Sequence, residues 1–314
     1  MKPGRAIIPG RWRAVVRDSG IAAVTSPTYQ ASILPGRRLH LHEGPIDLVI
    51  GVAGDAAAVG KAHALASGRF DGLLSSLVAE LPALRSPVSA TGPVLHGAVA
   101  QRMLAATRPH CARFVTPMAA VAGAVADEVL GAMASLPGLT RAYVNNGGDI
   151  AIHLSAGETI RLGTVSSLAA AAPDGFVTLS GSDAIRGIAT SGAGGRSFSL
   201  GIADAVTILA HDAASADVAA TLIGNAVNVD HPAIERAPAS SLDPDSDLGE
   251  QLVTLRVGAL PPDAISQALN AGMAVAQDML DRDLIYGGLL CLGDQTSSVG
   301  RAEAFARRVC GTTD

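Results

Sequence analysis

Two residues with oxygen-bearing side chains, Asp217 and Thr221, lie four positions apart in a segment that the sequence predicts to be helical. A spacing of four places both side chains on one face of a helix. A carboxylate and a hydroxyl there would offer two oxygens to Mg²⁺, which takes a few protein oxygens beside water and phosphate. Because such pairs are common in helices, the alternative is that Asp217 is solvated and Thr221 only packs.

A second candidate is the run Asn146-Gly147-Gly148-Asp149, which follows a predicted strand. Two glycines let a ligand approach the backbone closely, and the flanking amide and carboxylate can hydrogen-bond the polar edge of a ring. The same letters also favour a tight hairpin turn, for which Asn-Gly is a strong signal. Taken alone, this run indicates the turn.

A third candidate is the end of another predicted strand, where Thr190, Ser191 and Gly192 lead into further glycines. Exposed backbone N–H groups in such a segment can hold phosphate. It is not a Walker loop, because no Gly-Lys-Ser or Gly-Lys-Thr follows. A flexible loop without a ligand explains the composition equally well.

The fourth candidate is residues 116–127, a helix start almost free of large side chains. Thr116 followed by Pro117 is a favoured way to begin a helix. A ligand could lie against this backbone, and a carbonyl such as that of Ala120 could contact an ion. The alternative is a buried packing helix.

These segments must be positioned by a fold that alternates paired strands with paired helices, which favours an α+β class. We expect helices over residues 55–81 (with a break near Gly68), 93–107, 117–136, 212–227 and 262–282. We expect strands over residues 12–18, 21–25, 39–42, 46–50, 112–115, 141–145, 150–154, 159–165, 175–179, 184–189, 205–210, 252–257 and 284–291. Residues 230–250 are rich in Pro, Asp and Ser and should form an exposed loop within one domain spanning 1–314.

The bulk composition excludes some functions. With 16% charged residues, a net charge of −5 and 3% aromatics, the chain offers little for nucleic-acid binding. The three cysteines form no C-x-x-C pair and no apolar run reaches membrane length, so we expect a cytoplasmic protein without a membrane partner. The Ala- and Gly-rich composition permits a homo-oligomer without requiring one.

The order of the four candidates resembles that in the ApbE-like superfamily, whose best-known members are FAD:protein FMN transferases. The matching strings are residues 119–126, 145–150, 189–192 and 216–221, and the resemblance covers about residues 116–227. It implies an ApbE-like fold, in which β-β-α-α units form a mixed or antiparallel sheet layered with helices. It also implies a Mg²⁺ site at Asp217, Thr221 and the Ala120 carbonyl, with FAD as ligand or substrate beside the Gly-Gly-Asp turn and a protein as acceptor.

The chain departs from the family pattern at several positions. Gly123 and Val125 replace a Lys and a Tyr, and the His-Ile-Ile-Asp-Pro string gives way to residues 196–204, which contain no histidine. Asp204 is a substitute catalytic candidate. The departures resemble a short, uncharacterised branch of the superfamily. They leave open a flavin- or nucleotide-binding protein without transferase activity, or an enzyme acting on another heterocycle such as a pterin.

Overall fold

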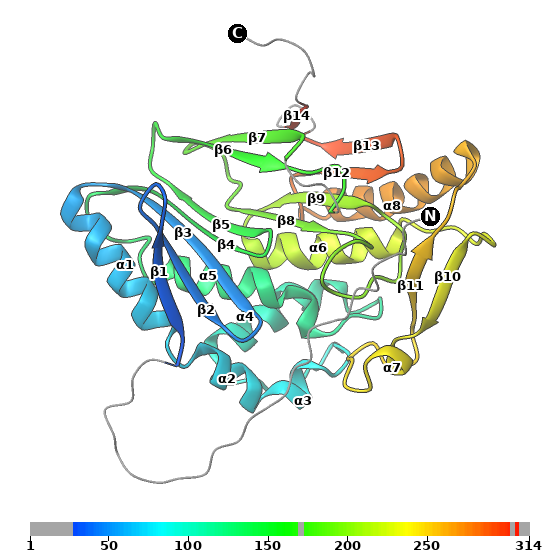
Figure 1. Ribbon diagram of the computed structural model, residues 1–314, viewed down its shortest axis with the longest axis horizontal. Helices are drawn as coiled ribbons and strands as arrows, with labels where there is room; N and C mark the ends of the chain where they lie inside the picture. The colour runs from blue at the N-terminus through cyan, green and yellow to red at the C-terminus, as the bar shows by residue number, and fades with distance from the viewer. Residues whose placement is uncertain (1–27, 169–172, 302–304, 308–314) are drawn as a thin grey trace.

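The centre of the molecule is one large antiparallel sheet. The computed structural model describes residues 28–168, 173–301 and 305–307. The strands are β1 (Gln30–Leu34), β2 (Arg38–Glu43), β3 (Ile46–Gly54), β4 (Leu139–Asn146), β5 (Asp149–Leu154), β8 (Gly187–Ser191), β9 (Ala205–Ala210), β12 (Gly287–Leu292) and β13 (Gln295–Gly300). They lie in that order across a nine-stranded sheet, each antiparallel to its neighbour (Figure 1).

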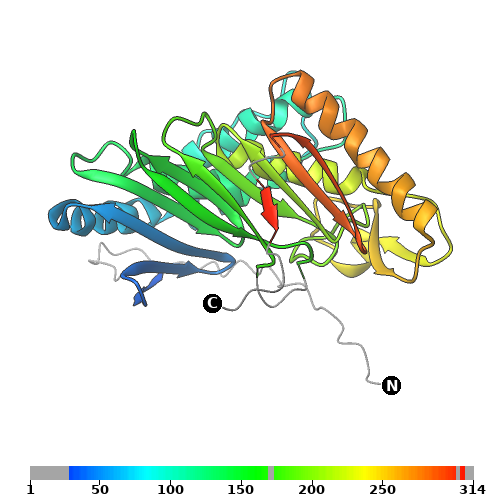
Figure 2. The ribbon, with the colours of Figure 1, turned by 90° about the horizontal axis from the view of Figure 1, so that it is seen from above.

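Helices cover one face of this sheet (Figures 1 and 2). They are α1 (Ala56–Phe70), α4 (Ala98–Thr107), η2 (Pro117–Ala120), α5 (Val121–Gly131), α6 (Ala213–Ala226) and α8 (Pro262–Asp281). In β3 the side chains alternate, so that Leu48 and Ile50 are buried while Asp47 and Val49 are half-buried. The main core therefore lies between the sheet and the helices, and α5 and α6 lie at its centre.

A smaller, three-stranded sheet packs over part of the other face. It consists of β6 (Thr159–Thr164), β7 (Gly175–Ser180) and β14 (Phe305–Arg307). A second apolar cluster joins the two sheets, and it includes Ile152 of β5 and Leu179 of β7. Because β9 lies between both cores, all six of its residues are buried. The α+β class and the layering with helices are confirmed, and the main sheet is antiparallel throughout its described strands.

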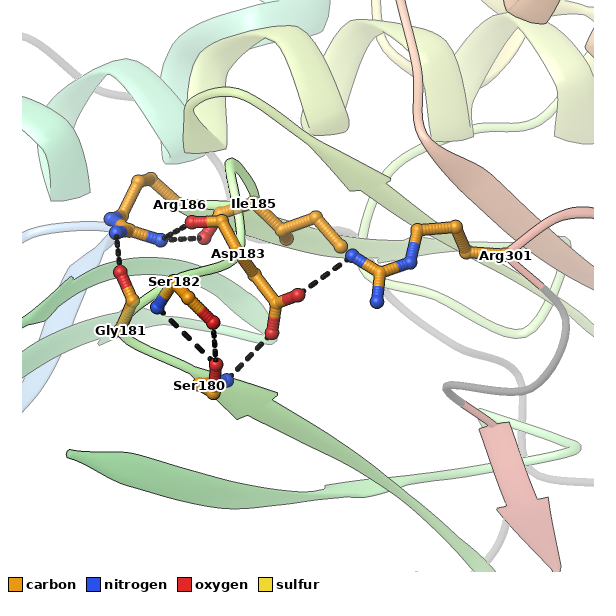
Figure 3. A network of polar contacts seen from close by, with 7 residues as sticks. All are labelled: Ser180, Gly181, Ser182, Asp183, Ile185, Arg186 and Arg301. Atoms are coloured by element: carbon orange, nitrogen blue, oxygen red, sulfur yellow. Dashed lines mark hydrogen bonds and ion pairs between the residues drawn. The ribbon is translucent and has the colours of Figure 1, made fainter. Parts of the chain in front are cut away.

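A polar network fixes the turn between β7 and β8 (Figure 3). Asp183 Oδ2 accepts the N–H of Ser180 at 2.7 Å, and Asp183 Oδ1 accepts from Arg301 Nη1 at 2.7 Å. Arg186 donates from the same turn to the carbonyl of Gly181 at 2.9 Å. These contacts tie the start of β8 to the residue that follows β13.

Several element boundaries differ from the expectation. The long helix of residues 55–81 ends at Phe70, and the chain continues as α2 (Leu73–Ala79) and α3 (Leu81–Leu84). The break lies at Gly72, whose φ of 74° only glycine adopts readily, and not at Gly68. The next helix, α4, begins at Ala98 and not at Pro93. Residues 112–115 form no strand, because a turn follows the short helix η1 (Arg108–His110).

Residues 230–250 are more ordered than a plain exposed loop. They contain β10 (Ile234–Pro238) and α7 (Ala239–Leu242), and β10 pairs with β11 (Leu252–Val257) in a separate two-stranded sheet. The Thr254 N–H and hydroxyl donate to the carbonyls of Ser199 and Gly201, both at 2.8 Å. Thr116 donates its hydroxyl to Asp247 Oδ2 instead of capping its own helix. The pairing of β10 with β11 and the contact of Asp247 with Thr116 hold this segment, which its polar composition did not predict.

The strands expected over residues 12–18 and 21–25 lie outside the described residues. The remaining predicted strands and the helices α6 and α8 form within a few residues of the expected bounds. The helix expected over residues 117–136 begins as η2 and ends at Gly131, and β1, β10, β13 and β14 were not predicted. None of the helices in the described part of the chain is both long and apolar enough to cross a membrane.

Candidate functional site

The candidate site is built where the first turns of α5 and α6 meet. A Cβ placed on Gly123 of α5 would lie 2.2 Å from the carbonyl oxygen of Ala213 at the start of α6. Only a glycine at this position lets the two backbones approach so closely. This explains why Gly123 stands where the family resemblance leads one to expect lysine.

Each of these helices supplies a carboxylate to the N-terminus of the other. Asp217 of α6 accepts the N–H of Gly123 on its Oδ2 at 3.0 Å. Asp127 of α5 accepts the N–H groups of Ala213 and Ala214, at 3.0 and 2.9 Å, one on each oxygen. The first N–H groups of a helix have no partner within the helix, so the reciprocal contacts satisfy donors that would otherwise be buried alone.

Asp217 also lies close to Asp149, which is brought from the Gly-Gly-Asp turn. Burial raises the pKa of Asp217 well above its ordinary value, and the negative charge of Asp149 raises it further. Burial raises the pKa of Asp149 to about 7, against the lowering effects of the Thr190 N–H and of the Arg196 guanidinium. The half-buried Asp149 and the buried Asp217 resist ionising together, and a cation would relieve this repulsion.

Two further contacts join the motifs. Asn146 is buried and donates from its side-chain nitrogen to the carbonyl of Ala122 at 3.1 Å, which links the turn after β4 to the start of α5. The N–H of Thr190 donates to Asp149 Oδ1 at 3.3 Å, which links the end of β8 to the same turn. Segments that are far apart in the chain therefore converge.

The Gly147-Gly148 turn has the tight hairpin form that Asn-Gly favours. Gly147 and Gly148 adopt φ values of 69° and 118°, and the Gly148 N–H donates to Asn145 Oδ1 at 2.8 Å. The pair connects β4 directly to β5. The turn and the site are compatible, because the same geometry presents Asp149 to Asp217.

The other predicted residues lie around this centre with different partners. Ala120 is buried at the N-cap position of α5. The Thr190 hydroxyl lies 2.9 Å from that of Thr207, and Gly192 packs against the carbonyls of Ala203 and Asp204. Thr221 lies one turn after Asp217 on α6, and its hydroxyl makes no hydrogen bond with any described residue.

The side chain of Asp204 contacts the turn that follows β12. Its Oδ2 accepts the N–H of Gly293 at 2.7 Å, and burial raises its pKa. No contact among the described residues joins its side chain to Asp149 or Asp217.

The donor set fits Mg²⁺ by type. Asp217 uses one oxygen for Gly123 and retains lone pairs, and the Thr221 hydroxyl is without a hydrogen bond in the described structure. The described residues contain no group of three or more His, Cys, Asp or Glu side chains that could enclose a metal. A site with few protein oxygens suits Mg²⁺, which keeps water and substrate phosphate as its other ligands.

Two residues of this region were not predicted from the sequence as site residues. Asp127 is the last residue of the fourth candidate segment, residues 116–127. Nothing in the residues around it in the sequence indicates that it caps α6. Burial and the charge of Asp212 raise its pKa to about 7. Arg196 lies in the segment that replaces the family's histidine string, and only the folded loop brings it to Gly147.

The chain is similar to several proteins of known sequence. The UPF0280 protein of Methanopyrus kandleri is 37% identical over 205 residues, which cover 62% of this chain and 79% of that protein. The UPF0280 protein of Methanococcoides burtonii is 41% identical over 124 residues, which are 39% of this chain and only 51% of the relative. These names state no activity.

Two solved structures are also similar, namely the ApbE protein of Thermotoga maritima and the apo flavinyl transferase ApbE of Pseudomonas stutzeri. The Thermotoga maritima protein is 14% identical, and the match covers 81% of this chain and 78% of that chain. The Pseudomonas stutzeri protein is 12% identical, and the match covers 88% of this chain and 96% of that chain. Both matches have a TM-score of 0.35. That score is too low to support a comparison of sites.

A family model described as AbpE bacteria matches residues 31–302. The chain therefore belongs to this ApbE-related family.

Proposed function

We propose that the protein binds a flavin nucleotide together with Mg²⁺ and acts at the phosphoanhydride of FAD, as an FMN transferase homologue with a protein acceptor. The observation that carries this proposal is the Asp149–Asp217 pair, where a half-buried and a buried carboxyl from two separate motifs repel each other while accepting the N–H groups of Thr190 and Gly123. Such a pair creates a need for a cation at a site that also has glycine-rich backbone beside it.

Asp217, Thr221 and the main-chain carbonyl of Ala120 would hold the ion. When bound, Mg²⁺ would neutralise negative charge on a pyrophosphate as the anhydride bond breaks. Asn146 anchors the Gly-Gly turn to α5, and so fixes the surface on which the flavin would lie.

The end of β8 would line the opposite side of the ligand. Thr190 is tied to Asp149 through its N–H, which leaves Ser191 and Gly192 as the next groups along the strand. Asp204 is the candidate that would accept the proton of the attacking hydroxyl, since a carboxylate can act as a base and burial raises its pKa.

A second candidate function is flavin or nucleotide binding without turnover. It is favoured by residues 196–204, which contain no histidine, and by the Gly293 N–H, which already occupies one oxygen of Asp204. In this case the site would bind the ligand and release it unchanged.

Incubation of the purified protein with FAD and Mg²⁺ separates these functions. Release of AMP, measured by liquid chromatography and abolished by EDTA, supports the transferase chemistry. FAD binding without AMP release supports the binding protein. If FAD neither binds nor is cleaved with Mg²⁺ present, the flavin proposal is wrong, and mass spectrometry of the co-purified ligand would test for another heterocycle.

A further inference from the structure

Arg196 lies directly on the Gly147 turn of the candidate site. A Cβ built on Gly147 would be 1.8 Å from Arg196 Nη2 and 2.9 Å from its Cζ. The guanidinium therefore occupies the space that any side chain at position 147 would take. Gly147 also has a φ of 69°, so the backbone itself favours glycine, whereas the exposed guanidinium is the far end of a flexible side chain that can move.

The Arg196 side chain is exposed and has no hydrogen-bond or ion-pair partner among the described residues. This contrasts with Arg186 and Arg301, which are held by the turn before β8. Its charge lowers the pKa of Asp149, but no ion pair joins the two in the described structure. A guanidinium with five donors thus lies beside the site, exposed to solvent and not paired with any described protein group.

The charges around the Gly147 turn describe the ligand that would fit. Asp149 accepts the Thr190 N–H on one side of this turn, and the Arg196 guanidinium lies against Gly147, so carboxyl oxygens and a cationic fork are present at the same turn. A phosphate group satisfies both, since it ligates Mg²⁺ with one oxygen and pairs with the planar guanidinium fork through others. If Arg196 served only to neutralise Asp149, a direct ion pair would be expected.

We propose that Arg196 binds a phosphate group of the ligand beside the Gly147 turn. The inference rests on the proposed function for the location of the nucleotide, but it does not require the ligand to be a flavin. The ligand class that it names is a metal-bound diphosphate or phosphate ester.

Isothermal titration calorimetry with Mg²⁺ present tests this inference on inorganic pyrophosphate, FMN and riboflavin. Arg196→Gln should weaken the binding of pyrophosphate and FMN roughly ten-fold or more, the usual effect of losing a hydrogen bond to a charged group. Arg196→Lys should restore part of the affinity. Riboflavin, which has no phosphate, should bind both proteins equally, or neither.

Arg256→Gln is the matched control, because it removes a positive charge from an exposed pair with Glu235 on the two-stranded sheet. It should leave all affinities unchanged, and both variants should melt at the temperature of the unaltered protein.

The inference is overturned if Arg196→Gln binds pyrophosphate and FMN as tightly as the unaltered protein does. It is equally overturned if the unaltered protein binds no phosphate-bearing probe, or if Arg196→Gln weakens riboflavin as much as FMN. Arg196-dependent binding of pyrophosphate without binding of any flavin supports the inference and refutes the flavin proposal, so the two can fail separately.

Discussion

Asp217 combines two roles that conflict at neutral pH. It accepts the Gly123 N–H at the start of α5, which stabilises the helix, but its burial beside Asp149 disfavours its charge. An amide of the same shape could still accept the hydrogen bond without carrying the charge. The two roles can therefore be separated by a single substitution.

We expect Asp217→Asn to keep the metal-free protein at least as stable as before at pH 7.5, because it removes a buried charge and keeps an acceptor for Gly123. The same variant should lose the rise in Tm that Mg²⁺ gives the unaltered protein. Differential scanning fluorimetry with and without Mg²⁺ measures both. Asp217→Ala removes the acceptor as well, and should melt lower than Asp217→Asn without metal. An undiminished Mg²⁺ effect in Asp217→Asn would remove Asp217 from the metal site.

The helices α5 and α6 behave as one unit because each supplies a cap to the other. The carboxylate of Asp127 accepts two N–H groups at the start of α6, and Asp212 adds a local cap by accepting the Ser215 N–H at 2.7 Å. Loss of Asp127 would leave the Ala213 and Ala214 donors buried without a partner.

For Asp127→Ala we predict a loss of about 1–3 kcal/mol in the free energy of unfolding, the range expected for unsatisfied buried donors and a lost cap. Urea denaturation followed by circular dichroism gives this value. Asp71→Ala is a suitable comparison, since Asp71 is exposed at the end of α1 and should change stability little. Equal stability of Asp127→Ala and the unaltered protein would show that these hydrogen bonds contribute nothing net.

The close approach of the two helices can be tested separately from their caps. Alanine has a higher helix propensity than glycine by about 1 kcal/mol. At Gly60 of α1, where a Cβ would meet nothing within 4 Å, Gly60→Ala should stabilise the protein by up to about that amount. At Gly123 the new methyl would press on Ala213, so Gly123→Ala should destabilise by about 1–3 kcal/mol despite its propensity. If both variants gain stability, the helices are not packed as tightly as described.

At the scale of the molecule, the clustered carboxyls link stability to pH. In the unfolded chain Asp149 ionises near its ordinary value, but in the fold its pKa is about 7, and the pKa of Asp217 is raised as well. Between these values the folded protein holds protons that the unfolded chain has released. Raising the pH from about 4 through about 7 therefore removes stability that these groups give at low pH.

Since Mg²⁺ competes with these protons, the Tm increase that it produces should be larger at pH 8 than at pH 5. Fluorimetry at the two pH values measures the difference. Asp217→Asn serves as the reference, because other titrating groups contribute equally in both proteins. An increase in Tm that is the same at both pH values would show that the metal binds away from this pair.

The described strands also bear on domain organisation. The nine-stranded sheet takes strands from Gln30 to Gly300, and β11 hydrogen-bonds back to Ser199 and Gly201. We therefore propose that residues 1–314 form a single domain, as the sequence led us to expect. Limited proteolysis that yielded two separately stable fragments would contradict this.

The sequence by itself determined much of the local structure and the order of the motifs. Residues 205–210 are apolar and β-branched enough to predict β9, and Asn-Gly predicted the turn between β4 and β5. It also identified Asp149 and Asp217 as separate candidates, because local spacing is visible in a linear string.

Only the tertiary structure decided which of these residues meet. That the charge of Asp149 reaches Asp217, that Asp127 caps α6, and that Arg196 lies on Gly147 all depend on segments distant in the chain coming together. The same reason explains the elements found within residues 230–250, since β10 pairs with β11 and Asp247 accepts a hydrogen bond from Thr116. Local propensity gives an element its type, whereas burial, backbone approach and the repulsion of charges arise only when elements pack together.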